Sequence, residues 1–273
     1  MSVIPTDIPL QASARPWSRL AGAALLALVL GFALLAPLVF PADPLRQSLR
    51  HILAAPDAAS PLGYDHLGRS LTARLAAALR LSLAIAAAAV ASAALLGVAA
   101  GVLAAWRGGW VDRAVSLIAD AFLALPGLLL VLIVSAIVPV TPMAFWIGLT
   151  LVLWIEYFRL TRATVSRLMA APAIEASRLL GFGPLYVFRR HLWPELAPVL
   201  LTLGAFGAAT AIMMIAALGF VSVGMRPPTP ELGLMMVELL PYYREAPMAL
   251  LVPVLATFLT LLGLNLVAGG RRT

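Results

Sequence analysis

The sequence contains no cysteine, no lysine and few charged residues of any kind. Without cysteine the chain forms no disulfide bond, and the redox state of its compartment leaves no trace in the sequence. The absence of lysine excludes the loop G-x-x-x-x-G-K-[ST], whose lysine contacts nucleotide phosphates. All 19 basic residues are arginine, and charged residues make up 11% of the chain. A soluble domain of this length has about a quarter.

The sequence is rich in apolar residues. Of its 273 residues 62% are hydrophobic, and the mean hydropathy is +1.00. Several apolar runs reach about 20 residues, enough to cross a hydrocarbon core of about 30 Å. The sequence therefore predicts an all-α, polytopic protein embedded in a lipid bilayer. The net charge of +7 fits arginines at the cytoplasmic ends of spans, so nucleic acid is not an expected partner.

About six transmembrane helices are predicted. The expected spans are 20–40, 81–105, 115–138, 143–157, 196–221 and 248–267. The first apolar run is too long for the h-region of a signal peptide, so it is interpreted as an uncleaved span. An N-terminus inside the cell places about twice as many arginines in cytoplasmic as in external segments, which predicts both termini in the cytoplasm.

These spans define the expected organisation of the chain. It consists of a cytoplasmic tail (1–19), a first helix (20–40), an external segment (41–77), a domain of five transmembrane helices (78–268) and a second cytoplasmic tail (269–273). Within the domain, a charged connection (159–195) is expected on the inner side and a polar loop (224–247) on the outer side. In the outer loop, 231–240 is expected to form a short helix at the membrane surface.

The charged connection carries the signals of an ordered helix. Pro172 fits a first turn, where its missing N–H would have no partner. Glu175 lies close to that N-terminus, where a carboxylate interacts favourably with the helix dipole. Gly181 fits the left-handed position that ends many helices. On the residues alone, the segment is either a solvated connector or a docking element.

A second short helix follows in the same connection. Gly183-Pro184 begins it, and residues 185–192 are expected to end it before Pro194. The predicted arrangement is a helix–turn–helix on the inner face. Three of its arginines are expected to be exposed: Arg178, Arg189 and Arg190.

The motif Glu175-Ala-Ser-Arg-Leu-Leu-Gly181, followed by Leu192-Trp-Pro194, resembles the cytoplasmic motif of ABC importer permeases. Other stretches are similar to the peptide and nickel branch of that family, in its second, C-type subunit. They are Pro61 to Ser70, Gly108 to Arg113, Asp120 to Pro126, Gly224 to Met235 and Gly263 to Val267. These segments occur in the order of the family and cover about residues 60–268.

The resemblance implies a type I ABC importer permease that forms half of a translocation pathway for small peptides, nickel or metal chelates. It implies no catalytic residue, metal site or cofactor in this chain, with ATP and Mg²⁺ bound by a separate ATPase. Cytoplasmic ATPases, a second permease and an extracytoplasmic substrate-binding protein are the expected partners, in a bacterial inner membrane.

The resemblance also assigns residues to two sites. Those expected at the ATPase are Glu175, Ala176, Ser177, Arg178, Gly181 and Pro194. Those expected to face the binding protein are Asp65, Gly68, Arg69, Pro227, Pro228, Pro230 and Gly233. Ser70, Glu156, Ser177 and Gly269-Gly270 depart from the residues usual in the family, which leaves the substrate open.

Charged residues near the spans have simple interpretations. Asp120 is expected to pair with Arg113 or Arg159, and Glu156 with an arginine one turn further along its helix. Three external residues, Asp57, Asp65 and His66, lack the fixed spacing of a metal site and are expected to cap the helix that begins near Ser70.

Two other classes of function remain open on these residues. An ion-driven secondary transporter would need buried acidic residues at mid-membrane and broken helices in paired positions. A membrane scaffold would only anchor cytoplasmic partners.

Overall fold

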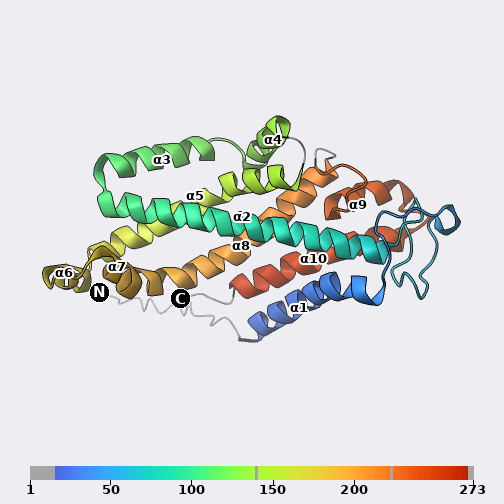
Figure 1. Cartoon of the computed structure of the whole chain (residues 1–273), viewed down its shortest axis with the longest axis horizontal. Helices are drawn as coiled ribbons and strands as arrows, with labels where there is room; N and C mark the ends of the chain where they lie inside the picture. Colours follow the sequence, from blue (N-terminus) through green and yellow to red (C-terminus); the bar gives the residue numbers. More distant parts are fainter. Residues whose placement is uncertain (1–15, 139–140, 222–223, 270–273) are drawn as a thin grey trace, which may run out of the picture.

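Long helices lying side by side form the body of the molecule (Figure 1). The computed structural model describes residues 16–138, 141–221 and 224–269, and within these ranges the regular elements are helices with one isolated bridge. The five longest helices are α1 (Pro16–Val39), α2 (Leu71–Arg107), α5 (Pro142–Met169), α8 (Trp193–Phe220) and α10 (Pro247–Gly269). Each belongs to a segment long and apolar enough to cross a membrane, which confirms the all-α membrane prediction.

Small residues bring the helix backbones together. A Cβ at Gly97 or Gly101 of α2 would overlap the backbone of α5, and one at Gly22 of α1 would overlap α10. In lipid, where apolar side chains gain little by leaving the solvent, such close approach is a main source of helix association. Gly97 and Gly101 are thus packing positions, whereas Cβ atoms at Gly204 and Gly207 would make only ordinary contacts.

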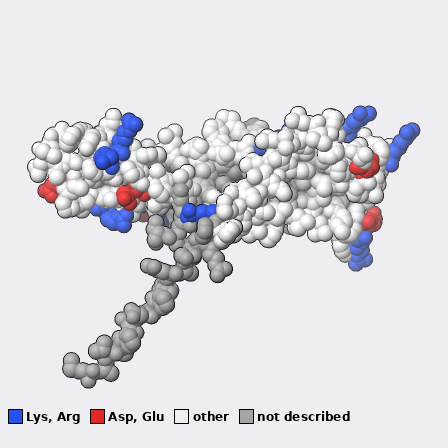
Figure 2. Space-filling model, turned by 90° about the horizontal axis from the view of Figure 1, so that it is seen from below, with Lys and Arg blue, Asp and Glu red and all other residues white. Residues whose placement is uncertain are grey.

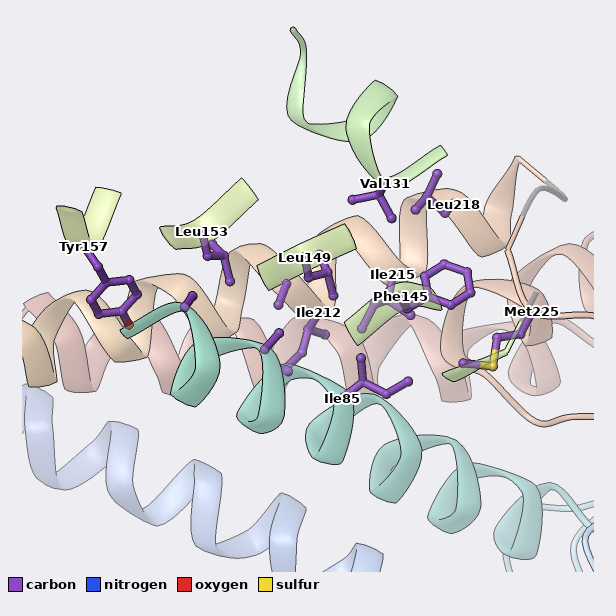
Figure 3. Close-up of a cluster of buried hydrophobic side chains, with 14 residues drawn as sticks. Ile85, Val131, Phe145, Leu149, Leu153, Tyr157, Ile212, Ile215, Leu218 and Met225 are labelled. Carbon is purple, nitrogen blue, oxygen red and sulfur yellow. The ribbon is translucent and has the colours of Figure 1, made fainter. Parts of the chain in front are cut away.

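The largest buried cluster joins α2, α5 and α8 to the shorter helix α4 (Gly127–Ile137) (Figure 3). Along α5 it includes Phe145, Leu149, Leu153 and Tyr157, each no more than 1% exposed. Ile85 of α2 and Ile212, Ile215 and Leu218 of α8 face them, with Val131 of α4 at one edge. This cluster fixes the relative positions of the three central helices.

The predicted span 115–138 is broken. Helix α3 (Gly109–Leu123) and α4 meet at 88°, so the segment is either a bent span or a re-entrant pair. Pro126 stands directly before α4, where its missing N–H and its fixed φ favour a new helix start over continuation of the old one. Counting the pair as one span gives the six predicted spans.

Two helices extend further than their apolar runs. Helix α2 begins at Leu71, so the predicted domain boundary at 77/78 falls inside it. Ser70 caps it by accepting a hydrogen bond from the Ala73 N–H, and this polar signal lies upstream of the apolar run. Helix α5 continues to Met169, so the connection to α8 begins about ten residues later than the predicted Arg159. The charged turns after Arg159 remain helical, and Arg159 and Arg162 in them form ion pairs with aspartates of α3.

Polar segments lie at both ends of the bundle. One end carries α6 (Pro172–Leu179) and α7 (Pro184–Val187); the other carries residues 40–70, with a 3₁₀ turn at Leu49–His51, and α9 (Leu232–Leu239) (Figure 1). On the face drawn in Figure 2, most charged side chains gather toward these two ends. Helix α1 begins and α10 ends toward the α6 side. The predicted tails lie outside the described residues, apart from residues 16–19 in α1 and Gly269 in α10.

Candidate coupling segment and ion-paired opposite end

The connecting segment (residues 170–192) joins α5 to α8 through α6 and α7. Pro172 occupies the first turn of α6 and Glu175 lies in the same turn, as predicted. At the other end Gly181 has φ +82°, a left-handed conformation that side chains disfavour. The N–H of Phe182 there donates to the Ser177 carbonyl at 3.1 Å, which closes the helix end. Local sequence signals thus determined α6.

Buried apolar side chains anchor the connecting segment to the bundle. Ile174 of α6 and Val187 of α7 join Val165 of α5 and Leu192 and Leu196 in one cluster. Each is 2% exposed or less, so the segment packs firmly on the ends of the long helices.

Polar contacts of the connecting segment reinforce this anchoring. The Ser177 hydroxyl lies 2.9 Å from His191 Nε2 and donates to the Ala173 carbonyl. The guanidinium of Arg178 lies 5.3 Å from the ring centroid of Trp106. Ser177 and Arg178 were both predicted to lie at the interface with the ATPase. Ser177 is buried and serves the segment itself, whereas Arg178, with Arg189 and Arg190, is exposed.

The outward side of the connecting segment is apolar. Its exposed large side chains are Leu179, Leu180, Phe182, Leu185 and Tyr186, interspersed with the exposed Glu175, Ala176 and Gly181. Leu179 is 83% exposed, and the rings of Phe182 and Tyr186 stack with centroids 4.2 Å apart. Five large apolar side chains exposed within residues 179–186 of an otherwise polar segment are typical of a protein-binding surface. Sequence reasoning passed over these residues, although Leu179-Leu180 inside a charged stretch was the available signal.

The predicted helix end before Pro194 is wrong. A π-helical turn (Phe188–Leu192) continues α7 directly into α8, so Pro184–Phe220 is one helix of 37 residues. In this turn the Trp193 N–H donates to the Phe188 carbonyl, five residues back. Pro194 follows this turn directly and lies inside the continuous helix, where it removes one backbone hydrogen bond.

At the opposite end, the ion-pair assembly (residues 41–74 with α9) holds two carboxylates and two guanidiniums inside the protein. Arg69 Nε lies 2.5 Å from Asp65 Oδ2, and Arg74 Nε lies 3.4 Å from the same oxygen. Both arginines also reach Glu238 Oε2 of α9, at 2.9 Å from Arg69 and 2.6 Å from Arg74. Asp65, Arg69 and Arg74 are each 1% exposed. The four charges cancel, which makes their burial tolerable.

Backbone geometry positions this network. Asp65 Oδ1 accepts the N–H groups of Leu67 and Arg69, each at 2.9 Å. Gly68 between them has φ +69°, and a Cβ there would overlap the Ser48 carbonyl. Asp65 therefore orients arginines and a turn; the cap of α2 is Ser70 and not Asp65, contrary to prediction.

Glu231 caps α9 from a buried position. Its carboxylate accepts the N–H groups of Gly233 and Leu234 at 2.9 and 2.8 Å. Burial raises the pKa of Glu231, and the hydrogen bonds from the backbone oppose that rise only in part. Gly219 of α8 leaves room for the Glu231 side chain, because a Cβ at this position would overlap the Glu231 carboxylate. The predicted helix at 231–240 exists, but its first half is buried against the bundle.

Comparison with known proteins gives this architecture a family. The family described as "Binding-protein-dependent transport system inner membrane component" matches residues 97–270. The nickel transport system permease protein NikC of Escherichia coli (strain K12) is 32% identical over 256 residues, covering 94% of this chain and 92% of NikC. The di/tripeptide transport system permease protein DppC of Pseudomonas aeruginosa (strain UCBPP-PA14) is 33% identical over 268 residues, covering 96% and 88%.

The chain belongs to this family. It is a permease subunit of the peptide and nickel branch of ABC importers, and the resemblance found in its motifs is confirmed. A dipeptide transport system permease protein DppC from Haemophilus influenzae, 29% identical over 88% of this chain, agrees.

Most of the predicted binding-protein contacts of this permease are not on its surface. Asp65, Gly68, Arg69 and Gly233 are buried, and a Cβ at Gly233 would overlap the Ala216 carbonyl. Asp65, Gly68 and Arg69 form part of the ion-pair assembly, and Gly233 packs it against α8. Pro227 and Pro228 are exposed and Pro230 is half-buried, so only this part of the set is available to a partner.

Asp57, Asp65 and His66 of the permease do not form a common site. Asp57 accepts hydrogen bonds from the Ser60 N–H and the Tyr64 hydroxyl, which lower its pKa. His66 stacks on Tyr242, with ring centroids 5.2 Å apart. Within the described ranges, no group of three or more His, Cys, Asp or Glu residues could hold a metal ion.

Proposed function

We propose that this permease pairs with a second permease subunit to import nickel, a metal chelate or small peptides, and that cytoplasmic ATPases drive it through the connecting segment. The proposed cargo follows from the relatives, which are nickel and di/tripeptide transport permeases. A separate ATPase is expected because the lysine-free chain has no phosphate-binding loop. ATP and Mg²⁺ would then bind to that partner, and this chain would carry no cofactor.

The exposed apolar patch on the connecting segment carries the assignment of the ATPase contact. Leu179, Leu180 and Leu185 project from a segment whose other side is anchored in the bundle. A short amphipathic helix of this kind binds by laying its apolar side chains into a groove. Glu175, Ala176, Arg178 and Gly181 would lie at the rim of that contact, as the sequence motif predicts.

Rigid linkage turns this contact into a coupling device. The connecting segment continues without a break into α8, so movement of an ATPase would be passed into the membrane-spanning bundle. Packed elements switch between discrete arrangements and do not deform smoothly. Closure of two ATPases would thus move the two permeases together between inward-open and outward-open states.

This assignment fixes an orientation in the bacterial inner membrane. The connecting segment would lie in the cytoplasm, together with the start of α1 and the end of α10 on the same side of the bundle. The ion-pair assembly would lie outside, where the exposed Pro227 and Pro228 are available to an extracytoplasmic substrate-binding protein.

Co-purification tests the ATPase contact. The permease is co-expressed with candidate ATPases and a second permease, either as wild type or with Leu179→Ser and Leu185→Ser together. We expect the wild type to retain the ATPases and the variant to lose them. Leu49→Ser is the matched control, because Leu49 is 86% exposed at the opposite end and should have no effect. Equal retention of the ATPases by all three proteins would refute the assignment.

A further inference from the structure

A long apolar groove runs between α2 and α8, at the end of the bundle that carries α6 and α7. Its volume is about 1210 Å³, above the range of about 300–1,000 Å³ that is typical of sites for drug-sized ligands. Leu95 and Leu103 of α2 line one side, Leu200 and Leu201 of α8 line the other, and Tyr157 of α5 also lines it. Leu95 and Leu201 are 73% and 66% exposed, so the groove is open along its outer side.

The groove has the length of one leaflet of a bilayer. At the helical rise per residue it extends about 17 Å along α8, from Trp193 to Gly204, and about 25 Å along α2, from Val90 to Arg107. One leaflet measures about 15 Å of hydrocarbon and about 20 Å with its headgroup layer, whereas a membrane-spanning helix covers about 30 Å. Helices α1 and α10 stop short of this end of the bundle (Figure 1). The groove therefore matches a lipid molecule better than a transmembrane helix of a partner.

One end of the groove has the residues of a headgroup region. Arg107, in the last turn of α2, is the charged residue among the described residues that line the groove. Within the described ranges, no hydrogen bond or ion pair engages its side chain. Trp106 and Trp193 line the same end, and tryptophan is enriched at the level of lipid headgroups. The guanidinium of Arg178 lies 5.3 Å from the ring centroid of Trp106 and adds a second positive charge.

The surroundings of this end also have a surplus of positive charge. Residues 106–120 and 156–195 contain eight arginines and five carboxylates. Two of the carboxylates, Asp112 and Asp120, form ion pairs with arginines of α5. The other three carboxylates, Glu156, Glu175 and Glu195, do not line the groove. An anionic group at this end would therefore meet arginine without competition from a carboxylate inside the groove.

We propose that the groove binds a phospholipid with an anionic headgroup, whose acyl chains lie between α2 and α8 and whose phosphate contacts Arg107. Basic pockets between transmembrane helices on the cytoplasmic side of a membrane bind such headgroups. The groove joins this positive end to an apolar channel of leaflet length. The inference rests on the proposed function in one respect: the orientation given by the connecting segment makes the leaflet the cytoplasmic one.

Native mass spectrometry of the permease with its co-expressed partners tests the headgroup contact. The delipidated complex in detergent is titrated with palmitoyl-oleoyl phosphatidylglycerol, which is anionic, and with the zwitterionic phosphatidylcholine of the same chains. We expect the wild type to prefer the anionic lipid. Arg107→Gln should reduce that preference about fivefold, the contribution of one arginine to binding an anionic lipid surface.

Arg113→Gln is the matched control for Arg107→Gln. Arg113 is an exposed arginine at the same end of the bundle and does not line the groove. Its substitution should leave the preference for phosphatidylglycerol at the wild-type value. A preference that survives Arg107→Gln, or that falls equally in Arg113→Gln, would overturn the proposal.

Narrowing the groove tests the position of the acyl chains. Leu201→Trp adds bulk at the open side of the groove, and Leu96→Trp adds the same bulk at an exposed position of α2 outside it. We expect Leu201→Trp to lose most of its bound phosphatidylglycerol and Leu96→Trp to bind it as the wild type does. Unchanged binding by Leu201→Trp would place the lipid elsewhere and refute the proposal. A helix of the second permease is the rival occupant: if Leu201→Trp alone releases that subunit, the groove is a subunit interface and the lipid site is wrong.

The lipid site and the proposed function fail separately, because the same spectra show bound lipid and bound ATPases as different masses. If the wild type retains no ATPase but prefers phosphatidylglycerol through Arg107, the lipid site stands and the ATPase assignment is wrong. If the ATPases are retained and Arg107→Gln keeps the preference, the proposed function stands and the lipid site is wrong.

Discussion

The two ends of this permease treat polar and apolar residues in opposite ways. In the ion-pair assembly, Asp65, Arg69 and Arg74 are buried and meet Glu238 in a neutral network. In the connecting segment, Leu179 and Leu185 are exposed while the hydroxyl of Ser177 is turned inward to His191. At these two ends, charge is therefore no guide to which residues are exposed.

The ion-pair assembly is complete within this chain, whereas the proposed function assigns the exposed surface of the connecting segment to contact with another protein. The ion-pair assembly satisfies its charges within the chain, so its stability should depend on each member. The connecting segment leaves apolar area in water, so changes there should affect association more than folding. Four substitutions test this contrast.

Arg74→Met should give the largest loss of stability. The change removes one cation and leaves Asp65 and Glu238 with a single arginine inside the protein, and breaking a buried pair in this way costs about 3–5 kcal/mol. The measurement is the free energy of unfolding in mild detergent. Arg244→Met, at an exposed arginine beside Tyr243, should stay within about 0.5 kcal/mol of wild type. Similar losses for both would mean that the ion pairs do not hold this end together.

Gly233→Ala should come next. Its Cβ would overlap the Ala216 carbonyl, so α9 must shift from α8, and overpacking of this kind costs about 1–3 kcal/mol. Gly31→Ala is the control, because a Cβ there meets nothing within 4 Å and alanine favours a helix. Thermal unfolding of the two variants should shift in opposite directions, and a stabilised Gly233→Ala would contradict the packing seen at α9.

Gly181→Ala should cost about 1–2 kcal/mol, the penalty for placing a side chain in a left-handed conformation. No atom lies within 4 Å of the added Cβ, so the cost is conformational and confined to the connecting segment. Gly183→Ala adds the same methyl group to an equally open site at φ −73°. Only Gly181→Ala should reduce ATPase co-purification while the bundle unfolds at nearly the wild-type temperature. Loss with both variants would point to a steric effect at the interface instead.

The smallest effect is a pH dependence at Glu231. Because burial raises its pKa in the folded state, the native protein holds a proton that the unfolded chain has released. Glu231 therefore favours folding most below about pH 4.5, and that contribution is lost as pH rises through the raised pKa. Glu231→Gln should remove this part of the slope of unfolding free energy against pH. The exposed Glu245→Gln should keep the wild-type slope; if it changes as Glu231→Gln does, burial is not the cause.

Local signals allowed much of the fold to be predicted. The apolar runs located α1, α8 and α10 to within a few residues, because long apolar helices depend on composition alone. Pro172 and Gly181 likewise bounded α6 correctly, since a missing N–H and a left-handed φ are properties of single residues. Pro126 carried the signal for the break in the third span, but an apolar run of the right length concealed it.

Contacts between distant segments were beyond such reasoning. Glu238 lies 164 residues from Arg74 and 169 from Arg69, and nothing near either arginine indicates that they share a carboxylate. For the same reason, Glu156 was predicted to pair along its own helix, whereas Arg159 and Arg162 bond to aspartates of α3. Burial of Asp65 and Gly233 follows from how α9 packs on α8, which no local pattern specifies.

The unbroken helix from Pro184 to Phe220 has a mechanical consequence. At 1.5 Å per residue, its 37 residues form a rod about 55 Å long, which packs against α2 along its length. A rotation of about 5° about the midpoint of such a rod displaces its two ends by about 2 Å in opposite directions. The far end carries Gly219, against which Glu231 and the start of α9 are seated. Under the proposed function, a small push on the connecting segment would reach the opposite rim of the permease as a displacement of similar size, which the start of α9 would have to accommodate.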